Sequence, residues 1–351
     1  MKREAKGAKT APTTTCLAVL SLLLCPLRGS ADQLPRVHVI ATGGTIASSA
    51  AGAVGVDQLV AGVPALTDVA EVSFEQVLRV GSSRITTQDW LALAESIDRS
   101  FSADPELAGV VVTHGTDSME ETAYFLDLVV QSDRPVVVTG AMRTADAVGA
   151  DGPANLLAAV RVAVSDESRG RGTLVVMNDE IHLARDVVKT NTLAVHAFRS
   201  PMVGAVGEVG AGVLFRRGRD SRPERFSFQG VTELPRVEVD YSFVGSEGVG
   251  LMTARHHGAR GVVIAAFGSG RVAGAQADQI TEALREGIIV VMSSRVGAGR
   301  VQDEYAGALG AEGLSVLYAD NLNPQKARVL LMVALTRTQE PAVLAEIFER
   351  Y

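Results

Sequence analysis

The sequence predicts an α/β protein in which a larger N-terminal domain with a doubly wound parallel sheet precedes a smaller C-terminal α/β domain. Short, apolar, β-branched runs alternate with longer amphipathic stretches, as expected where helices cover both faces of a parallel sheet. A chain of 351 residues is also long enough for two domains. A polar segment rich in Arg, Ser and Pro interrupts the alternation between them.

Six runs have the composition of strands that are buried on both faces. They are Val37–Ala41, Val110–Thr113, Val136–Thr139, Leu174–Met177, Val262–Ala266 and Ile288–Met292. The stretches between them include three amphipathic segments typical of helices, and a fourth amphipathic segment ends the chain. These four are Thr87–Ser100, Ser118–Val130, Asn155–Ser165 and Ala342–Tyr351.

The first residues are typical of a cleaved secretory signal. A basic start precedes an apolar run at Cys16–Leu27, and the small residues Gly29, Ser30 and Ala31 follow. The run is too short to span a bilayer comfortably, which favours a signal peptide over an anchor. We therefore expect a periplasmic or secreted protein, with no membrane partner after cleavage. The expected boundaries are 1–31 for the signal peptide, 32–215 for the N-terminal domain, 216–235 for a linker and 236–351 for the smaller domain.

Charge and cysteine content exclude several classes of function. The formal net charge is −7, and removing residues 1–31 takes away five basic residues and one acid, which leaves −11. Such a chain does not resemble a nucleic-acid binder, which would carry a basic surface. Both cysteines also leave with the signal, so we expect no disulfide, no cysteine nucleophile and no cysteine-ligated metal. Six scattered histidines have no metal-ligand spacing, and we expect neither a metal nor a cofactor.

Small and hydroxylic residues follow several of the predicted strands. Thr42–Thr45 follows the first and His114–Asp117 the next, while Gly140–Arg143 and Asn178–Asp179 follow two more. Ligands of open parallel sheets bind beyond the carboxyl ends of the strands. Glycines there let the backbone approach a ligand, and threonines supply hydroxyl groups. The segments are neither a dinucleotide fingerprint nor a phosphate-binding loop.

Two of these segments resemble the signature sequences of bacterial type II L-asparaginases. They are Ala41-Thr42-Gly43-Gly44-Thr45-Ile46-Ala47 and His114-Gly115-Thr116-Asp117-Ser118-Met119-Glu120-Glu121-Thr122. Shorter matches follow in collinear order at Gly140–Arg143, Ala150–Pro153, Lys189–Thr192 and Leu322–Arg328. The resemblance extends from about Pro35 to Tyr351. It implies a flavodoxin-like N-terminal domain and a homotetramer, built from dimers, whose subunits share active sites.

The resemblance also implies a reaction and roles for individual residues. Family members attack the side-chain amide of L-asparagine, and in some cases L-glutamine, with a threonine hydroxyl and release ammonia through an acyl-enzyme. Thr45 matches the nucleophile, and Thr116, Asp117 and Lys189 match the residues that assist it. Substrate would be held by the residues that match the family's binding positions: Gly44, Ser82, Ser83, Gly115, Thr116, Asp117 and, from a neighbouring subunit, Glu304.

The residues by themselves allow plainer interpretations. Asp117 and Glu120 together fit the capping of a helix whose apolar face is Met119, Ala123, Leu126 and Val130. Asp117 can serve as cap and as ligand. His114 fits a buried structural histidine better than a base. Taken alone, Lys189 fits a solvated surface position and Thr45 fits a turn.

The segment after Thr45 departs from the family pattern. There the family has a flexible lid with a tyrosine that closes over the substrate, whereas Ile46–Val56 is several residues shorter and has no tyrosine. The first tyrosine of the chain is Tyr124, and Ser48 and Ser49 are poorer substitutes. Pocket positions also differ: Ser83 stands in place of a glutamine, and Ser269 and Arg271 stand where asparagines are common. The segment around Glu304 aligns only with a gap.

Three functions therefore compete. The first is a secreted or periplasmic L-asparaginase, motivated by the motifs. The second is a non-catalytic amino-acid-binding paralogue that kept the carboxylate and ammonium clamps, motivated by the missing lid tyrosine. The third is the amidase subunit of a tRNA-dependent amidotransferase, against which the N-terminal signal argues because that partner is cytoplasmic.

Overall fold

The computed structural model describes residues 33–44, 46, 48–49, 52–53, 55–219, 222–302 and 315–351. The predicted signal peptide, Thr45 and Glu304 lie outside these residues. Residues 34–351 form one compact unit. Within it, an eight-stranded sheet and a separate four-stranded sheet carry the predicted larger and smaller α/β domains. The predicted domain boundaries stay predictions, although the described part of 216–235 contains no helix or strand.

The larger sheet contains all four strands predicted for this half of the chain, with one more parallel strand at its edge. The five parallel strands lie in the order β4-β1-β5-β6-β7, which is the flavodoxin-like doubly wound order. Their bounds are β1 Arg36–Ala41, β4 Glu71–Gln76, β5 Leu107–Thr113, β6 Val136–Thr139 and β7 Thr173–Met177.

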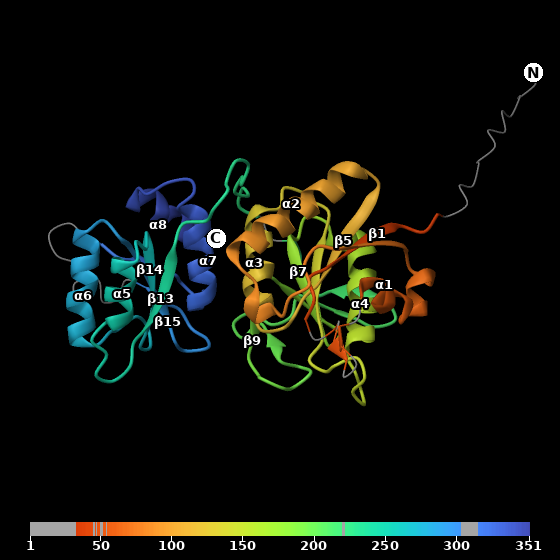
Figure 1. Ribbon diagram of the computed structural model, residues 1–351, viewed down its shortest axis with the longest axis horizontal. Coiled ribbons are helices and arrows are strands. Elements are labelled where there is room, and N and C mark those ends of the chain that lie inside the picture. The colour runs from red at the N-terminus through yellow and green to blue at the C-terminus, as the bar shows by residue number, and fades with distance from the viewer. Residues whose placement is uncertain are drawn as a thin grey trace, which may run out of the picture. The chain divides into compact units, whose positions relative to one another are not determined.

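Helices cover both faces of this sheet because its strands are apolar throughout. Alternate strand residues such as Val110 and Val112 pack with α2 (Thr87–Ala103) and α3 (Met119–Val129). Val111 and Val137, which point the other way, pack with α1 (Val56–Ala61) and α4 (Gly152–Val164). Figure 1 shows these two pairs of helices on opposite sides of the sheet.

Three antiparallel strands extend the sheet beyond β7, which the sequence pattern did not predict. They are β8 Glu180–Leu183, β11 Gly207–Val209 and β12 Val213–Phe215. A two-residue turn at Asn178–Asp179 joins β7 to β8, and both residues have positive φ angles of 51° and 63°. Asparagine and aspartate tolerate that conformation, and it suits tight hairpins. This pair therefore forms the tight turn of a β-hairpin at the carboxyl end of β7.

The smaller sheet is wholly parallel, in the order β13-β14-β15-β16. It contains the two strands predicted for this half of the chain. Helices α5 and α6 cover one face. Helices α7 and α8 cover the other and share a hydrophobic core with α2 and α3 of the larger domain, so that α3 packs against α7. The bounds are β13 Val237–Tyr241, α5 Val249–His256, β14 Gly261–Ala266, α6 Gly274–Arg285, β15 Ile289–Ser294, β16 Leu317–Tyr318, α7 Pro324–Ala334 and α8 Pro341–Arg350.

Several short elements complete the fold. Strands β2 (Ser48–Ser49) and β3 (Gly52–Ala53) pair as an antiparallel hairpin within the segment where the family lid is expected. Strands β9 (Val188–Lys189) and β10 (Phe198–Arg199) form a second small hairpin. Short segments of 3-10 helix lie at Pro64–Asp68, Ser82–Arg84 and Asp166–Ser168.

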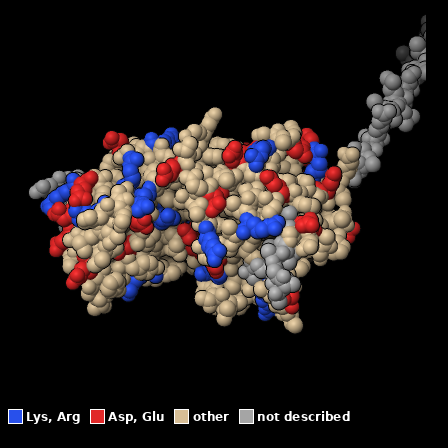
Figure 2. All heavy atoms as spheres, viewed as in Figure 1, with Lys and Arg blue, Asp and Glu red and all other residues tan. Residues whose placement is uncertain are grey.

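The visible surface mixes charges of both signs. Figure 2 shows acidic and basic side chains interspersed on this face of the described residues. In the same part of the chain, no helix is both long and apolar enough to cross a bilayer.

Asn155 of α4 connects two strand ends and the start of its own helix through its buried side-chain amide. Its Nδ2 donates to the Gly140 carbonyl at 2.9 Å and to Asp151 at 3.1 Å, while its Oδ1 accepts from the Asn178 backbone N–H at 2.9 Å. Asp151 in turn accepts from the backbone N–H of Met142. The loops after β6 and β7 are thereby held to the start of α4.

We predict that Asn155→Ala lowers the free energy of unfolding by about 3 kcal/mol, because it leaves a buried backbone donor and a buried acceptor unpaired. Urea denaturation measures the change. Gln88→Ala, which removes an exposed amide from α2, is the matched control. Equal effects of the two substitutions would contradict this account of Asn155.

Candidate active site

The predicted site residues lie where the strand order of the larger sheet reverses. After β1 the chain crosses to β4 on one side, and after β5 it crosses to β6 on the other. Such a switch point leaves a crevice beyond the carboxyl ends of the two central strands. Gly44 follows β1 there, and Gly115, Thr116 and Asp117 follow β5.

Close packing of glycines brings three chain segments together at this crevice. Gly44 has φ +88°, and a Cβ added to it would lie 2.3 Å from the Gly115 Cα. A Cβ on Gly115 would lie 2.6 Å from the Ser82 Oγ. Only glycine allows this approach. The structure therefore places Gly44, Gly115 and Ser82 together, as the sequence predicts for a binding site.

Lys189 reaches the same place from the β9–β10 hairpin. Its Nζ lies 2.9 Å from the Thr116 Oγ1 and 2.9 Å from Asp117 Oδ1. The Thr116 side chain is buried, whereas 66% of the Asp117 side chain is exposed and can receive a ligand. Because an ammonium only donates, the Thr116 oxygen accepts from Lys189 and its own proton is free for another acceptor. The interpretation of Lys189 as a solvated surface residue is wrong.

The serines of the 3-10 turn Ser82–Arg84 differ in their surroundings. Ser82 is buried, its Oγ accepts from the Asp117 backbone N–H at 3.1 Å, and its carbonyl accepts from the Ser118 hydroxyl at 2.8 Å. Ser83 is exposed. The Ser82 hydroxyl keeps its own proton for an anionic group, which suits the predicted contact with a substrate carboxylate.

Glu120 contributes to the site in a way that the sequence did not reveal. Its Oε2 accepts from the Lys189 backbone N–H at 2.5 Å, and its Oε1 accepts from the Asn323 side chain at 2.8 Å. Glu120 is nevertheless buried. The one sequence feature that indicates this role of Glu120 is its position in the first turn of an apolar helix. The same position also fits helix capping.

The capping interpretation of Asp117 and Glu120 is wrong. Helix α3 begins at Met119 with Ser118 as its N-cap, and no side chain caps it. The Asp117 carboxylate binds Lys189 and the Glu120 carboxylate fixes the backbone of that same lysine. The predicted apolar face of the helix is confirmed, since all four of its residues are buried: Met119, Ala123, Leu126 and Val130.

His114 is a buried structural residue, as predicted. Its Nδ1 lies 2.6 Å from the Gly115 carbonyl oxygen and therefore carries the proton. Within the described part of the chain, its Nε2 has no hydrogen-bond partner. Burial lowers the pKa of the ring to about 4, because a charged imidazolium would lose its hydration. The ring is therefore neutral at physiological pH.

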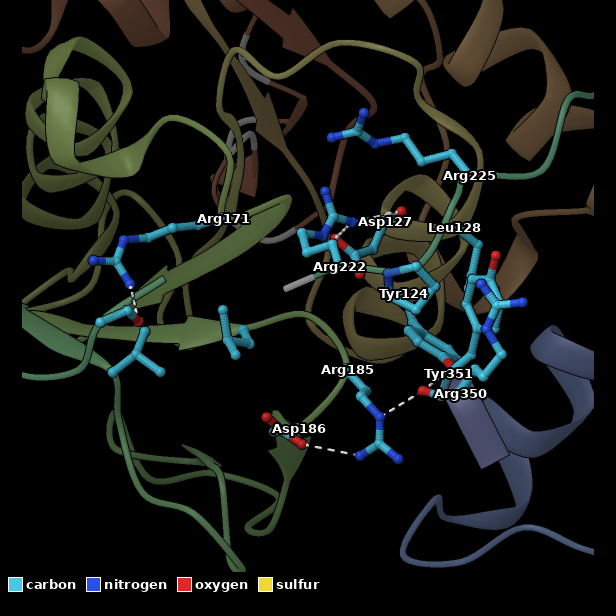
Figure 3. A pocket seen from close by; sticks show the side chains of 14 residues that line it. Tyr124, Asp127, Leu128, Arg171, Arg185, Asp186, Arg222, Arg225, Arg350 and Tyr351 are labelled. Atoms are coloured by element: carbon cyan, nitrogen blue, oxygen red, sulfur yellow. Dashed lines mark hydrogen bonds and ion pairs between the residues drawn. The ribbon is translucent and has the colours of Figure 1, made fainter. Parts of the chain in front are cut away.

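A pocket of about 260 Å³ lies elsewhere and contains none of the predicted site residues. Figure 3 shows arginines around it, most of them already engaged. Arg222 pairs with Asp127 at 2.6 Å, and Arg185 donates to Asn321 at 2.8 Å. Arg185 also donates to the Tyr351 main-chain oxygen at 2.5 Å, and Arg225 pairs with Asp133 at 3.0 Å. These four contacts are internal polar links of the protein.

The sequence and the fold are similar to those of known proteins. The family model described as "Asparaginase, N-terminal" matches residues 36–220, and that described as "Glutaminase/Asparaginase C-terminal domain" matches residues 236–348. "L-asparaginase 2" of Bacillus subtilis (strain 168) is 41% identical over 91% of this chain and 87% of its own. "Probable L-asparaginase periplasmic" of Haemophilus influenzae is 38% identical over 95% of this chain and 100% of its own. A solved structure, "Probable Cytoplasmic L-asparaginase" from Campylobacter jejuni, is 41% identical with a TM-score of 0.83, and the match covers 90% of this chain and 99% of that one.

We predict that the protein loses stability as the pH falls from 6.5 to 4, in part through His114. Over this range the unfolded chain binds a proton at His114 and the folded chain does not, because the folded pKa is about 4. The free energy of unfolding therefore falls by about 3 kcal/mol through this one group. His182, whose pKa burial also lowers to about 4, acts in the same direction.

His114→Gln should flatten the dependence of the free energy of unfolding on pH between 6.5 and 4. The measurement is urea denaturation at a series of pH values. His257→Gln, at an exposed position, is the control and should keep the wild-type slope. A wild-type slope in His114→Gln would show that His114 does not stay neutral in the folded protein.

Proposed function

This chain belongs to the asparaginase/glutaminase family, and we propose that it is an L-asparaginase, an amidohydrolase that converts L-asparagine to L-aspartate and ammonia. L-Glutamine is the second substrate to test. The observation that carries the proposal is the Lys189 ammonium, held at 2.9 Å from both Thr116 and Asp117 beside Ser82. In this arrangement the Asp117 carboxylate is available to the ammonium group of an amino acid, and the Ser82 hydroxyl is available to its α-carboxylate.

In the proposed complex, the exposed Asp117 carboxylate receives the substrate ammonium. The Ser82 hydroxyl donates to the α-carboxylate, and the exposed Ser83 contacts the same end of the ligand. Gly44 and Gly115 leave room for the substrate chain because neither has a side chain. The side-chain amide then points from this clamp toward the Thr116 hydroxyl and residue 45.

The proposed chemistry uses Thr45 as the nucleophile. Its Oγ bonds to the amide carbon while its proton passes to the leaving nitrogen, the C–N bond breaks and ammonia departs. Water then attacks the resulting ester and returns the proton to Thr45, which releases L-aspartate. Thr116, polarised by Lys189, and nearby backbone N–H groups would stabilise the oxyanion, and Lys189 beside Asp117 would relay protons.

We also propose an assembly and a location for the protein. The expected homotetramer would complete each site with Glu304 from a neighbouring subunit. The N-terminal segment supports export to the periplasm or beyond. One relative is named periplasmic and one structural neighbour is named cytoplasmic, so the segment itself is the argument for export.

The binding-protein alternative depends on the missing lid tyrosine. Tyr124 is no substitute, because it is buried in α3 and its hydroxyl donates to the Tyr351 main-chain oxygen at 3.2 Å. The clamp formed by Ser82 and Asp117 would bind an amino acid in either case. Turnover therefore separates the enzyme from the binding protein.

We predict that Thr45→Ala lowers kcat for L-asparagine by about 10³-fold or more, since it removes the nucleophile. Thr116→Val should lower kcat by about 10²-fold through loss of an oxyanion donor. Ammonia release by the purified protein measures both. Thr87→Ala, which removes a hydroxyl from the first residue of α2, is the control for threonine loss.

Equal ammonia release by the wild type and Thr45→Ala would exclude Thr45 as the nucleophile. If the wild type releases no ammonia, calorimetry with L-aspartate decides between the remaining functions. Binding of L-aspartate, together with no turnover of L-asparagine over long incubation, would establish the binding protein. Release of one ammonia per subunit, which accompanies formation of the acyl-enzyme, would exclude it.

We further predict slow chemistry that a full lid would accelerate. Residues 48–55 are Ala, Gly, Ser and one Val, so closing this segment orders residues at about 1–2 kcal/mol each with little apolar burial in return. Replacing the segment between Ala47 and Gly52 by a full-length, tyrosine-bearing lid should raise kcat more than it changes KM. An unchanged kcat in the graft, with a wild type that is already fast, would show that another group replaces the lid tyrosine.

A further inference from the structure

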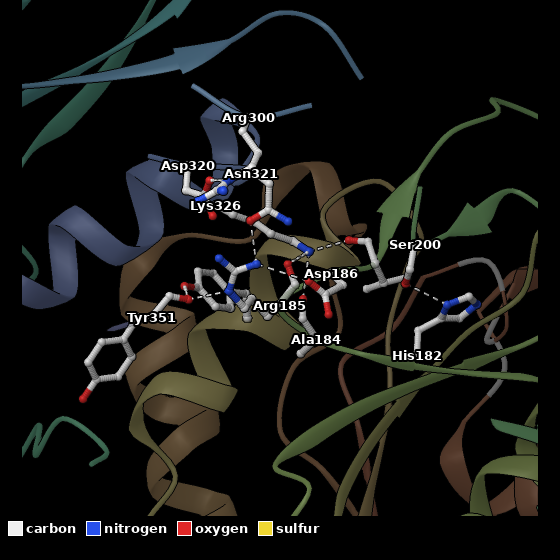
Figure 4. A network of polar contacts seen from close by, with 12 residues as sticks. His182, Ala184, Arg185, Asp186, Ser200, Arg300, Asp320, Asn321, Lys326 and Tyr351 are labelled. Carbon is white, nitrogen blue, oxygen red and sulfur yellow. Dashed lines mark hydrogen bonds and ion pairs between the residues drawn. The ribbon is translucent and has the colours of Figure 1, made fainter. Parts of the chain in front are cut away.

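Lys326 of α7 is a fully buried lysine, and among the residues that the structure describes the hydrogen bonds of its ammonium go to the main chain. Its side chain is 1% exposed. The Nζ donates to the carbonyl oxygens of Ala184 and Arg185, each at 2.8 Å, and to that of Val187. Figure 4 shows the side chain extending from the smaller domain to this segment of the larger one. The three N–H groups of the Lys326 ammonium thus donate to three carbonyl oxygens.

The segment that Lys326 holds leads directly to Lys189. Strand β8 ends at Leu183 and β9 consists of Val188 and Lys189, so the bound carbonyls belong to the turn between them. Val187 is two residues from Lys189. Fixing its carbonyl restricts the backbone from which the Lys189 side chain projects toward Thr116 and Asp117.

A second residue from the same turn of α7 restrains Lys189 through Glu120. Asn323 is the N-cap of α7, and its Oδ1 accepts from the Lys326 backbone N–H at 3.0 Å. Its Nδ2 donates to Glu120, whose other oxygen accepts from the Lys189 backbone N–H. Two residues three positions apart at the start of α7 therefore restrain the backbone that leads into Lys189. Lys326 does so through the Val187 carbonyl, and Asn323 does so through Glu120, which binds the Lys189 N–H.

The choice of lysine over arginine supports a specific role at this position. Residues 32–351 contain only two lysines, Lys189 and Lys326, and every other basic side chain apart from histidine is arginine. An ammonium is compact and has three donors, whereas a guanidinium is planar with five and cannot converge on the carbonyls of one turn. Burial lowers the Lys326 pKa to about 8, and Glu120 and Asp186 oppose that shift.

We propose that Lys326 is a positioning residue that holds Lys189 in its catalytic geometry. Asn323 and Glu120 form a second set of contacts with the same effect. The proposal rests on the proposed function, in which Lys189 assists the reaction. Lys326 touches no substrate in this scheme. It acts through the turn at 184–187, so that a helix of the smaller domain sets the geometry of a site in the larger one.

The first test compares Lys326→Met with Arg328→Met in the full chain. Arg328 is the matched control, since it lies on the same helix and also donates to a backbone carbonyl, that of Val237 at 2.8 Å. Lys326→Met should lower kcat for L-asparagine about 10- to 100-fold while KM changes less than about threefold, because the substrate clamp stays in place. Arg328→Met should leave kcat within about twofold.

Lys326→Arg separates positioning from charge. It keeps the cation but cannot reproduce the three contacts to one turn, so it should show the same loss of kcat as Lys326→Met. If Lys326→Met does not fold, Asn323→Ala takes its place and should lower kcat by about 10-fold.

A readout that needs no turnover distinguishes this proposal from the proposed function. With 13Cε-labelled lysine, the resonance of Lys189 is assigned by its loss in Lys189→Met. In Lys326→Met it should move toward the position of an unpaired lysine, and in Arg328→Met it should not. A wild type without turnover would defeat the proposed function alone. A folded Lys326→Met variant with an unchanged Lys189 resonance, or an equal loss of kcat in Arg328→Met, would overturn the positioning role.

Discussion

The geometry of the site depends on one ammonium group, that of Lys189, placed between a buried hydroxyl and an exposed carboxylate. Lys189 is far in sequence from Thr116 and Asp117, and it arrives on a hairpin outside the central strands. The parallel sheet supplies the crevice but no cation. In the doubly wound order, the chain leaves β1 and β5 toward opposite sides of the sheet, which creates an opening at the carboxyl ends of these two strands. The β9–β10 hairpin brings the Lys189 ammonium to that opening.

The ion pair between Lys189 and Asp117 matters for the position of the ammonium group rather than for the stability of the fold. Its carboxylate partner is 66% exposed, and ion pairs in contact with water add little to the free energy of folding. The groups that hold Lys189 in place are buried, by contrast. Glu120 and Lys326 have nearly all their polar atoms paired across the junction of the two domains, and α3 packs on α7 there. Residues of α7, a helix of the smaller domain, thus contact the segments that hold Lys189 in the larger one.

The sequence predicted those features that local patterns determine. Apolar runs located six strands, and amphipathic spacing located α2, α3, α4 and α8. Strands of two or three residues, such as β9 and β11, are too short to show a period. The turn at Asn178–Asp179 has the same composition as a ligand-binding strand end, and only its positive φ angles distinguish it. The contact of Glu120 with Asn323 joins residues 203 positions apart, which no local pattern indicates.

The central claim is that a clamp for both ends of an amino acid lies beside a polarised hydroxyl at the switch point of the larger sheet. A crystal structure of the protein with L-aspartate tests it most directly. The account predicts the ligand ammonium on Asp117, the α-carboxylate on Ser82, and the side-chain carboxylate within hydrogen-bond distance of the Thr116 hydroxyl, with Lys189 still bound to both residues. L-Aspartate bound elsewhere, or bound here with its side chain turned away from Thr116, would contradict the account.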